Sequence, residues 1–349
     1  MISASRFAST AAHVTPGYRL GSGGNEERFD RCSSARADMD WRPTAAGADD
    51  AHSRAAPPCR AGPRASSRLQ TAELEGGVKT KRRVALVTGA SSGIGRACAQ
   101  QLASAGLAVY GTSRHPARYH RRGALPMLAL DVRHDNSVRA CVDRVMAETG
   151  RIDVLVNNAG VGMEGAVEET SLNEIRAVLE TNFFGAVRMM RAVLPIMRKR
   201  RSGRIINIGS AVGFLPMPYA AAYCASKHAL RGFSESLDHE VRRLGIRVSV
   251  IEPGFVRTDI VEHSPVAAAP FEPYISARSN PARAFRQAIA RGVDPNLVAR
   301  SVVEAATEKY PRLRYLPDGA ARVVALFRAV LPSPLFDFAF RKQIQMNDD

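Results

Sequence analysis

The stretch Arg83-Val-Ala-Leu-Val-Thr88-Gly89-Ala90-Ser91-Ser92-Gly93-Ile94-Gly95 decides how the rest of the chain is interpreted. Its apolar start is typical of a buried strand, and a helical pattern from Arg96 to Ala105 follows it. Glycines between a strand and a helix let the backbone turn sharply and approach a ligand closely. The helix N-terminus then offers N–H groups and a partial positive charge to a phosphate. Glycines also make ordinary turns, but this order of elements favours a dinucleotide site.

Outward from this stretch, short β-branched runs alternate with longer amphipathic segments, which is typical of a parallel α/β fold. We expect a Rossmann-type, doubly wound parallel sheet in a single domain over residues 78–335, with a C-terminal tail at 336–349. Residues 1–77 have no apolar period, which predicts a disordered extension or an upstream start codon assigned in error. A transit peptide is a weaker alternative, because acids appear from Glu26 onward.

The net charge of +16 comes from 49 Lys and Arg against 33 Asp and Glu, and almost all of it lies after residue 77. Basic runs at 79–83 and 198–201 each precede an expected strand, where a solvated connection is normal. Neither run is accompanied by zinc-finger spacing or by aromatic–basic interleaving. A solvated basic surface is therefore favoured over nucleic-acid binding.

The five cysteines form no CxxC pair and no metal-ligand spacing. This predicts reduced thiols, no metal site and a cytoplasmic protein. Cys98 and Cys141 fall on expected helix faces and should be core residues. No apolar stretch is long enough for a membrane span, so no transmembrane segment is expected.

Tyr223 and Lys227 stand four residues apart at the start of a helical stretch that runs to about Arg243, so they share one helix face. A phenol with its ordinary pKa of about 10 is a poor base near neutrality. A nearby ammonium group favours the phenolate and makes tyrosine a usable acid/base. Ser210 ends the expected strand 204–209 at the carboxyl edge of the sheet, where open α/β sheets bind ligands.

These motifs together resemble the short-chain dehydrogenase/reductase family over roughly residues 80–335. The resemblance is carried by TGxxxGxG at 88–95, NNAG at 157–160, YxxxK at 223–227 and the Pro253-Gly254 pair. In character the chain is similar to the hydroxysteroid and retinol branches, and also to bacterial members whose substrate is unknown. The resemblance implies an oxidoreductase that transfers hydride between a nicotinamide and a carbonyl or alcohol carbon.

The resemblance also assigns the catalytic roles. It implies that Ser210, thirteen positions before Tyr223, holds the substrate oxygen while Tyr223 exchanges the proton. Lys227 would orient the ribose and tune Tyr223, and Asn182 would hold a water that links Lys227 to solvent. From the residues alone, Asn182 could equally be an exposed position in the helix that the capping box Ser171–Glu174 begins.

The end of the second expected strand favours NADP(H) over NAD(H). An NAD site carries Asp or Glu there, whereas Arg suits a 2′-phosphate, and this chain has Ser113-Arg114. A solvent-facing loop arginine is the alternative. The expected cofactor-binding residues are Gly89, Ser91, Ser92, Gly93, Ile94, Gly95, Ser113, Arg114, Asp131, Val132, Asn158, Ala159, Gly160, Tyr223, Lys227, Pro253, Gly254, Val256 and Thr258.

Residues 259–293 contain four prolines among apolar residues, which suits a mobile lid over the substrate. Their apolar members suggest a lipophilic substrate, as do Met163, Phe214, Leu215 and Met217; ordinary loop packing is the alternative. The apolar C-terminal stretch 323–340 could cap the pocket, bury a dimer contact or touch a membrane. The apolar residues of the expected lid at 259–293 are Val266, Phe271, Tyr274, Ile275 and Phe285.

The helices around Asn182 and Tyr223 carry apolar residues on more than one face. The resemblance implies that they pair with their copies in a homo-oligomer; a monomer covered by the C-terminal segment is the alternative. A non-catalytic NADP(H)-binding sensor or scaffold on the same fold is the rival function. All four catalytic residues are present, which favours the enzyme.

Overall fold

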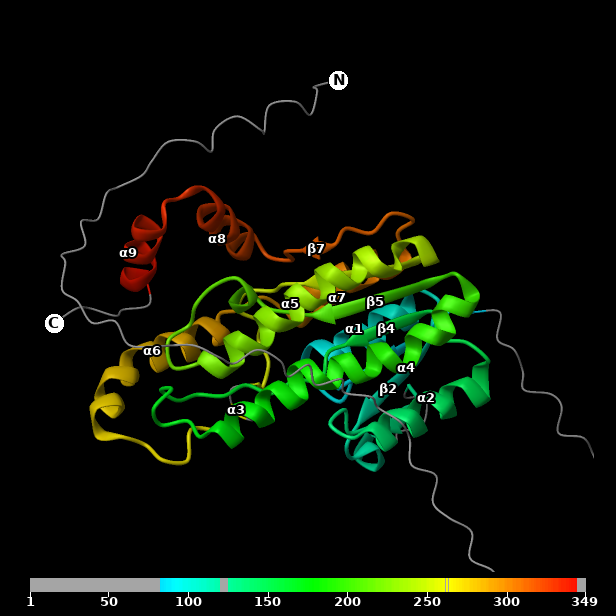
Figure 1. Cartoon of the computed structure of the whole chain (residues 1–349), viewed down its shortest axis with the longest axis horizontal. Coiled ribbons are helices and arrows are strands. Elements are labelled where there is room, and N and C mark those ends of the chain that lie inside the picture. Colours follow the sequence, from blue (N-terminus) through cyan, green and yellow to red (C-terminus); the bar gives the residue numbers. More distant parts are fainter. Residues whose placement is uncertain (1–81, 120–124, 261, 263, 344–349) are drawn as a thin grey trace, which may run out of the picture. The chain divides into compact units, whose positions relative to one another are not determined.

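The computed structural model describes residues 82–119, 125–260, 262 and 264–343 (Figure 1). All of these residues belong to one compact unit, Thr71–Asp349. The expectations for residues 1–77, and for Cys32 and Cys59, lie outside the described residues. Cys98, Cys141 and Cys224 are buried and free, as expected for reduced thiols.

A seven-stranded parallel sheet forms the centre of the unit, in the order β3-β2-β1-β4-β5-β6-β7. The chain leaves β1 for β2 and β3 on one side, and then returns to place β4 on the other side of β1. This reversal is the switch point of a doubly wound sheet, where a crevice opens at the carboxyl ends of the strands. The predicted fold is confirmed. The strands are β1 (Val84–Val87), β2 (Ala108–Ser113), β3 (Met127–Ala129), β4 (Val154–Asn157), β5 (Gly203–Ile208), β6 (Ile246–Ile251) and β7 (Arg314–Tyr315).

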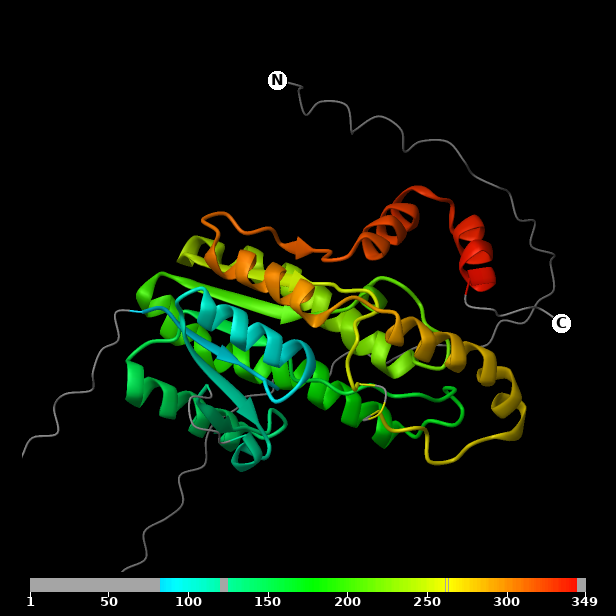
Figure 2. The ribbon, with the colours of Figure 1, turned by 180° about the vertical axis from the view of Figure 1, so that it is seen from behind.

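Helices cover both faces of the sheet because each strand alternates its side chains between two cores. Val84 and Leu86 face a core shared with α2 (Asp135–Thr149), α4 (Gly185–Arg200) and α5 (Ala221–Val241). Ala85 and Val87 face the other core, with α1 (Gly93–Ser104) and α7 (Pro295–Thr307). Figure 2 shows α1 and α7 side by side in front of the sheet, and their mutual packing agrees.

The helix that leads to Asn182 differs from the expectation. α3 (Leu172–Leu179) begins with the predicted capping box between Ser171 and Glu174. It does not run on evenly, because residues Glu180–Phe184 form a π-helical turn before α4 begins. The extra residue in this turn rotates Asn182 inward, where it is 2% exposed. The alternative of an exposed helix residue is therefore wrong.

The C-terminal third also departs from the expectation. Much of 259–293 is helical, as α6 (Glu272–Ala290), with Pro281 inside the helix. The expected boundary at 335/336 cuts through α9 (Ser333–Gln343), so residues 336–343 are not a tail. α8 (Gly319–Val330) precedes α9, and Phe336 of α9 is buried against the domain. The charges and prolines of these segments did not predict the helices. The helices are held in place by contacts with residues that are distant in the sequence.

Candidate active site

The glycine loop lies at the switch point, between β1 and α1. Gly89 has φ of +64°, a conformation in which a side chain would be strained. A Cβ at Gly95 would lie 2.2 Å from the carbonyl oxygen of Gly89 and 2.4 Å from Nδ2 of Asn158. Ser92 is the N-cap of α1 but its side chain makes no cap hydrogen bond, and no acid stands in the first turn. The loop therefore presents backbone groups and a helix N-terminus that fit a pyrophosphate.

Thr88 ties the glycine loop to the NNAG segment, a connection that the motifs alone did not show. Its buried hydroxyl accepts hydrogen bonds from the backbone N–H of Asn158 (2.9 Å) and of Ala159 (3.0 Å). The Asn158 amide donates back to the carbonyl oxygens of Thr88 and Gly89, each at 3.0 Å. Asn158 thus braces the cradle from the neighbouring strand. The exposed Gly160 follows it and lies against Asn182.

A hollow of about 380 Å³ opens where β2 and β3 end, at the position expected for the adenosine half of a dinucleotide. Arg114 lies exposed on its rim, next to Ser113. Asp131 in the same hollow accepts hydrogen bonds from the Arg133 guanidinium, at 2.6 Å from Nη2. This contact lowers the pKa of Asp131 to about 2. Its negative charge is thereby balanced, and Arg114 leaves the hollow net positive.

Arg133 was missed in the sequence, although it stands two residues after Asp131. A separation of two residues places side chains on the same face only within a strand, and β3 has already ended at Ala129. The sequence therefore did not predict that Arg133 and Asp131 would be in contact. Val132, between them, packs its side chain against Gly185 of α4. Val132 can therefore reach a cofactor only through its backbone.

Ser210, Tyr223 and Lys227 converge beyond the carboxyl end of β5. Ser210 follows that strand, and its hydroxyl accepts from the N–H of Val212 (3.3 Å) and is hydrogen-bonded to the Tyr223 hydroxyl. Lys227, 6% exposed, donates a hydrogen bond of 2.8 Å to the carbonyl oxygen of Ile208. Its ammonium lies 5.7 Å from the centre of the Tyr223 ring. The sequence prediction that these three side chains share one site agrees with this geometry.

The protonation states in this cluster differ from the expectation. Burial raises the pKa of Tyr223 to about 12, against an opposing effect of the Ser210 hydrogen bond. Burial also lowers the pKa of Lys227 to about 8. The expected phenolate is therefore not favoured in this state, and Tyr223 holds its proton at neutral pH. A protonated tyrosine beside a serine hydroxyl is suited to donate a proton to a carbonyl oxygen.

Asn182 supports the catalytic helix from the π-helical turn. Its Oδ1 accepts from the N–H of Val161 (2.8 Å), and its Nδ2 donates to the Val161 carbonyl (2.9 Å) and to the Ser226 hydroxyl (3.0 Å). Ser226 in turn donates to the carbonyl oxygen of Tyr223 (2.7 Å). Both amide hydrogens of Asn182 are thus used within the protein. A relay water would need its backbone carbonyl or the second lone pair of Oδ1.

The segment after β6 completes the expected cofactor wall. Ala211 next to Ser210 donates to the Pro253 carbonyl (2.8 Å), which joins this segment to the catalytic loop. A Cβ on Gly93 would lie 3.2 Å from Thr258, so the segment also reaches the glycine loop. Gly254 donates its N–H to the buried carboxylate of Asp318 (2.8 Å), a residue that the sequence reasoning missed. Val256 is buried between these contacts.

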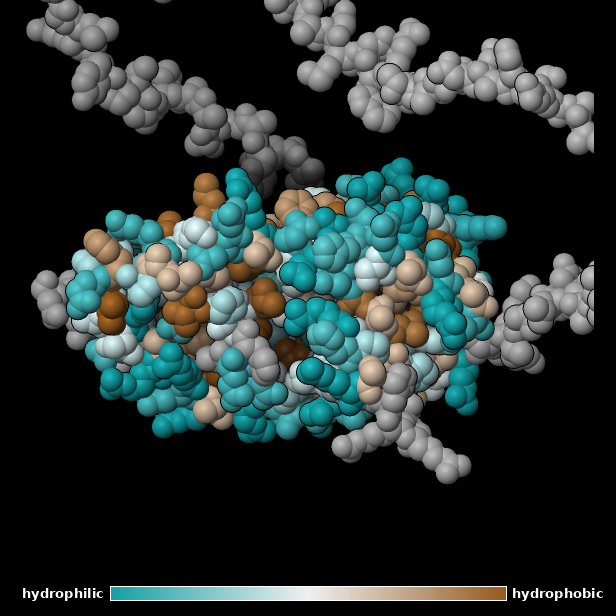
Figure 3. All heavy atoms as spheres, turned by 90° about the horizontal axis from the view of Figure 1, so that it is seen from below, coloured by the Kyte–Doolittle hydropathy of each residue, from teal (hydrophilic) through white to brown (hydrophobic). Residues whose placement is uncertain are grey.

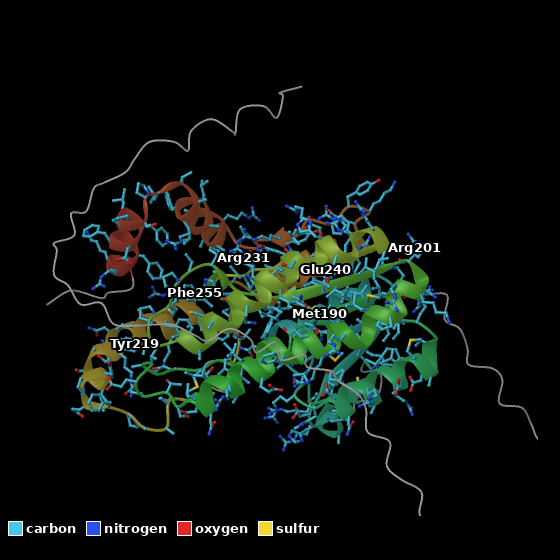
Figure 4. All side chains as sticks on the ribbon, in the orientation of Figure 1. Met190, Arg201, Tyr219, Arg231, Glu240 and Phe255 are labelled. Atoms are coloured by element: carbon cyan, nitrogen blue, oxygen red, sulfur yellow. The ribbon has the colours of Figure 1, made fainter. Side chains whose placement is uncertain are left out.

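The expected apolar substrate residues divide into two groups. Met163 lines a small hollow together with Ala222, which immediately precedes Tyr223, and with Ile175, which was not among the expected residues. Phe214 and Leu215 instead pack toward the C-terminal helices. Beside this hollow, the backbone carbonyl of Tyr219, a residue with φ of +59°, accepts a hydrogen bond from the N–H of Gly165. Figure 4 places Tyr219 and Phe255 toward the α6 end of the unit, and Met190, Glu240 and Arg201 toward the other end.

The expected lid is held against the 164–174 segment by acids. Glu169, whose side chain is fully buried, accepts from the Phe271 N–H (2.8 Å) and from Arg278 (2.6 Å). The Tyr274 hydroxyl donates to Glu168 (2.9 Å), and the Ala268 N–H donates to Glu174 (3.0 Å). Figure 3, seen from below, shows hydrophobic side chains breaking the hydrophilic surface at the end where α3 and α6 lie. α6 is thus a helix tethered to the 164–174 segment, which itself contributes Gly165, Val167 and Thr170 to the lining of the apolar hollow.

Within the described residues, no helix is long and apolar enough to cross a membrane, and no cluster of His, Cys, Asp or Glu could hold a metal.

Comparison with known proteins places these features in a family. A model of the short chain dehydrogenases matches residues 83–267. The 3-ketodihydrosphingosine reductase of Bacteroides thetaiotaomicron is 37% identical, over 74% of this chain and 96% of that protein. The estradiol 17-beta-dehydrogenase 1 of Rattus norvegicus is 36% identical, over 72% of this chain and 78% of that protein.

Solved structures give the same picture. A short-chain dehydrogenase from Streptomyces avermitilis is similar with a TM-score of 0.64 and 35% identity, over 76% of this chain and 98% of that one. A Burkholderia phymatum member in complex with NAD has a TM-score of 0.62 and 29% identity, over 71% and 95%. A metagenomic member in complex with NADP has a TM-score of 0.54 and 32% identity, over 67% and 96%.

Proposed function

The chain belongs to the short-chain dehydrogenase/reductase family, and from this premise we propose that it is an NADP(H)-dependent reductase of a lipophilic carbonyl compound. The observation that carries the proposal is the convergence of Ser210, Tyr223 and Lys227 beyond β5, beside a cradle that fits a dinucleotide. The sensor or scaffold alternative does not require these groups to meet.

Four side chains would each have a separate role in the reduction. A bound NADPH supplies the hydride. The Ser210 hydroxyl holds the substrate oxygen, and Tyr223, which carries its proton at neutral pH, donates that proton as charge develops on the oxygen. Lys227, whose ammonium lies 5.7 Å from the centre of the Tyr223 ring, would hold the ribose side of the cofactor. Asn182 positions Tyr223 through Ser226.

The NADP(H) preference is supported by charge. Arg114 is exposed on the rim of the hollow, and the only carboxylate among the residues lining that hollow, Asp131, is already paired with Arg133. A guanidinium can grip a 2′-phosphate with two charge-assisted hydrogen bonds, while an unpaired carboxylate would repel it.

The lipophilic substrate is supported by two independent features. The hollow before Tyr223 has a volume of only about 20 Å³, but Met163, Val167 and Ile175 line it, so the surface that a substrate would meet there is apolar. Two of the relatives bear the names of a 3-ketodihydrosphingosine reductase and an estradiol dehydrogenase, and both names refer to lipophilic compounds.

A panel of ketones and aldehydes, short and long, incubated with NADPH or NADH tests this function. We expect oxidation of NADPH in preference to NADH, and higher kcat/KM for the apolar members. Tight NADPH binding without turnover of any carbonyl compound or alcohol would instead support the sensor or scaffold.

A further inference from the structure

α8 is apolar on two opposite faces, and the described residues cover only one of them. Toward the domain, Ala321 is buried, and Val324 and Leu331 pack against the cluster that contains Leu215 of the catalytic loop. The opposite face bears four large apolar side chains at helical spacing, which we call the outer face of α8. These are Val323, Leu326, Phe327 and Val330, exposed by 51%, 62%, 49% and 66%.

α9 repeats this arrangement. Phe336 is 6% exposed and stacks on Phe340 on the inward side. Leu335 and Phe338 point the other way, at 53% and 68% exposure. Lys342 lies one turn after Phe338 on the same side of the helix. Figures 1 and 2 both show α8 and α9 beyond β7, the edge strand of the sheet, rather than on either face of the sheet.

The charges around this apolar surface are almost all positive. Residues 319–343 hold Arg322, Arg328, Arg341 and Lys342 against the single acid Asp337, which gives the segment a net charge of +3. Arg322 donates to the carbonyl oxygens of Leu316 and Pro317, and Arg328 lies over the inward ring of Phe336, so Lys342 is the cation that shares the outer side with Phe338. The aliphatic stems of such side chains can lie on an apolar surface while their charges reach outward to phosphates. Helices with apolar faces and flanking Lys and Arg are typical of elements that lie in the interface of an anionic bilayer.

Two contacts connect this surface to the active site. Asp318 caps α8 by accepting from the Ala321 N–H (2.7 Å), and its other oxygen accepts from Gly254 in the expected cofactor wall (2.8 Å). Phe336 of α9 packs with Ala211 and Leu215, directly after Ser210. The outer faces are therefore carried by helices that are fixed to the two loops flanking the site.

We propose that the outer faces of α8 and α9 bind the surface of a bilayer rich in anionic phospholipid, and hold the active site close to substrate dissolved in it. α8 and α9 have 12 and 11 residues, far too few to span a bilayer, so they would lie in its interface. A second copy fits less well, because a two-fold contact would bring two segments of net charge +3 together, with Lys342 on the contact side of each. The delivery of substrate rests on the proposed function; the binding to lipid does not.

Sedimentation with vesicles tests the binding. Full-length protein should bind vesicles of phosphatidylcholine mixed with phosphatidylglycerol at least about tenfold more tightly than phosphatidylcholine alone, and added salt should weaken this binding. The double variant Leu326→Gln/Val330→Gln should lose at least about tenfold in affinity, because it removes apolar contact. Lys342→Glu should weaken binding to the mixed vesicles by about fivefold. Its binding to vesicles of phosphatidylcholine alone should equal that of the wild type.

Tyr310→Gln is the matched control, because Tyr310 is a 76% exposed apolar side chain outside this surface. It should bind like wild type. An equal loss in this control, or no sedimentation of the wild type with the mixed vesicles, overturns the proposal. A third result would also overturn it. If the wild type did not bind vesicles and the double variant had a lower mass in light scattering, the outer faces of α8 and α9 would be the contact between two copies of the chain.

Turnover separates this inference from the proposed function. The double variant should reduce a short water-soluble ketone at the wild-type rate, but reduce a long-chain ketone in mixed vesicles about tenfold more slowly. Equal rates on the vesicle substrate would overturn the delivery role. Wild type that binds vesicles but reduces neither ketone would support the lipid surface and contradict the proposed function alone.

Discussion

The ammonium group of Lys227 lies 5.7 Å from the centre of the Tyr223 ring and is hydrogen-bonded to the carbonyl of Ile208 rather than to the phenol. The two groups therefore share a site without sharing a proton in this state. Tyr223 keeps a raised pKa of about 12 and Lys227 a lowered one of about 8, because burial disfavours both charged forms. The site is thus arranged to donate a proton, which suits reduction.

Replacing Tyr223 with Phe removes the proton donor and leaves the ring in place. We expect carbonyl reduction to fall by about 1000-fold, in the range of general acid catalysis, with the affinity for NADPH changed by less than about twofold. Stopped-flow turnover and fluorescence titration with NADPH measure the two quantities. Substantial activity in this variant would show that another group supplies the proton.

NADPH affinity should depend on pH through Lys227. The group is cationic below its lowered pKa of about 8 and neutral above it. The anionic cofactor is attracted to the cation, so affinity should be constant from about pH 7, where the 2′-phosphate is ionised, up to this value, and should weaken as pH rises through it, while Tyr223 remains protonated. Isothermal titration across this range measures the effect. Lys227→Arg stays charged and should bind with little pH dependence; a wild-type profile in that variant would remove Lys227 from the explanation.

The cofactor preference should depend on Arg114. Arg114→Asp removes a charge-assisted partner of the 2′-phosphate and adds a repulsive charge, so NADPH affinity should fall about 100-fold and NADH affinity by less than about threefold. Arg118→Asp is the control, because Arg118 is exposed four residues on and does not line the hollow. An unchanged preference in Arg114→Asp would move the phosphate site to other cations, such as Arg96 or Arg118.

The tether of α6 should affect substrate binding more than chemistry. Hydrogen bonds from Phe271 and Ala166, together with Arg278, lower the pKa of Glu169, so the tether should persist into mildly acidic solution. Glu169→Gln leaves Arg278 without its anionic partner, and we expect KM for an apolar ketone to rise several-fold while kcat changes by less than about twofold. Glu168→Gln removes only the charge at the exposed contact with Tyr274, because the amide oxygen can still accept from the hydroxyl, and it should leave KM nearly unchanged. A loss confined to kcat would argue against a lid.

The sequence was sufficient for the sheet and for the meeting of Ser210, Tyr223 and Lys227, because strands, glycine turns and an i, i+4 pair are local signals. It was insufficient where distant contacts decide. Asn182 is buried because a π-helical turn rotates it toward Ser226, 44 positions away. Asp318 joins Gly254 across 64 positions, and no short motif marks such a bond. The tail assigned from residue 336 is helical because Phe336 packs on Leu215.

The last prediction concerns assembly through α4 and α5. Phe184 and Phe233 are 46% and 37% exposed, and the Phe183 ring lies between them at centroid distances of 5.0 Å and 5.7 Å. In the described residues the C-terminal helices cover the loop at 211–215, while Phe184 and Phe233 stay exposed, so the monomer alternative lacks its expected cover.

A symmetric pairing of these helices would bury both rings against their copies. We expect light scattering to give a dimer or tetramer at micromolar concentration, and Phe233→Glu to give a monomer, because it would place like charges across the contact. Leu326→Gln/Val330→Gln should keep the wild-type mass, since α8 is a separate surface. A fully active monomeric wild type would exclude the pairing and leave the exposed ring of Phe233 without a structural role in assembly.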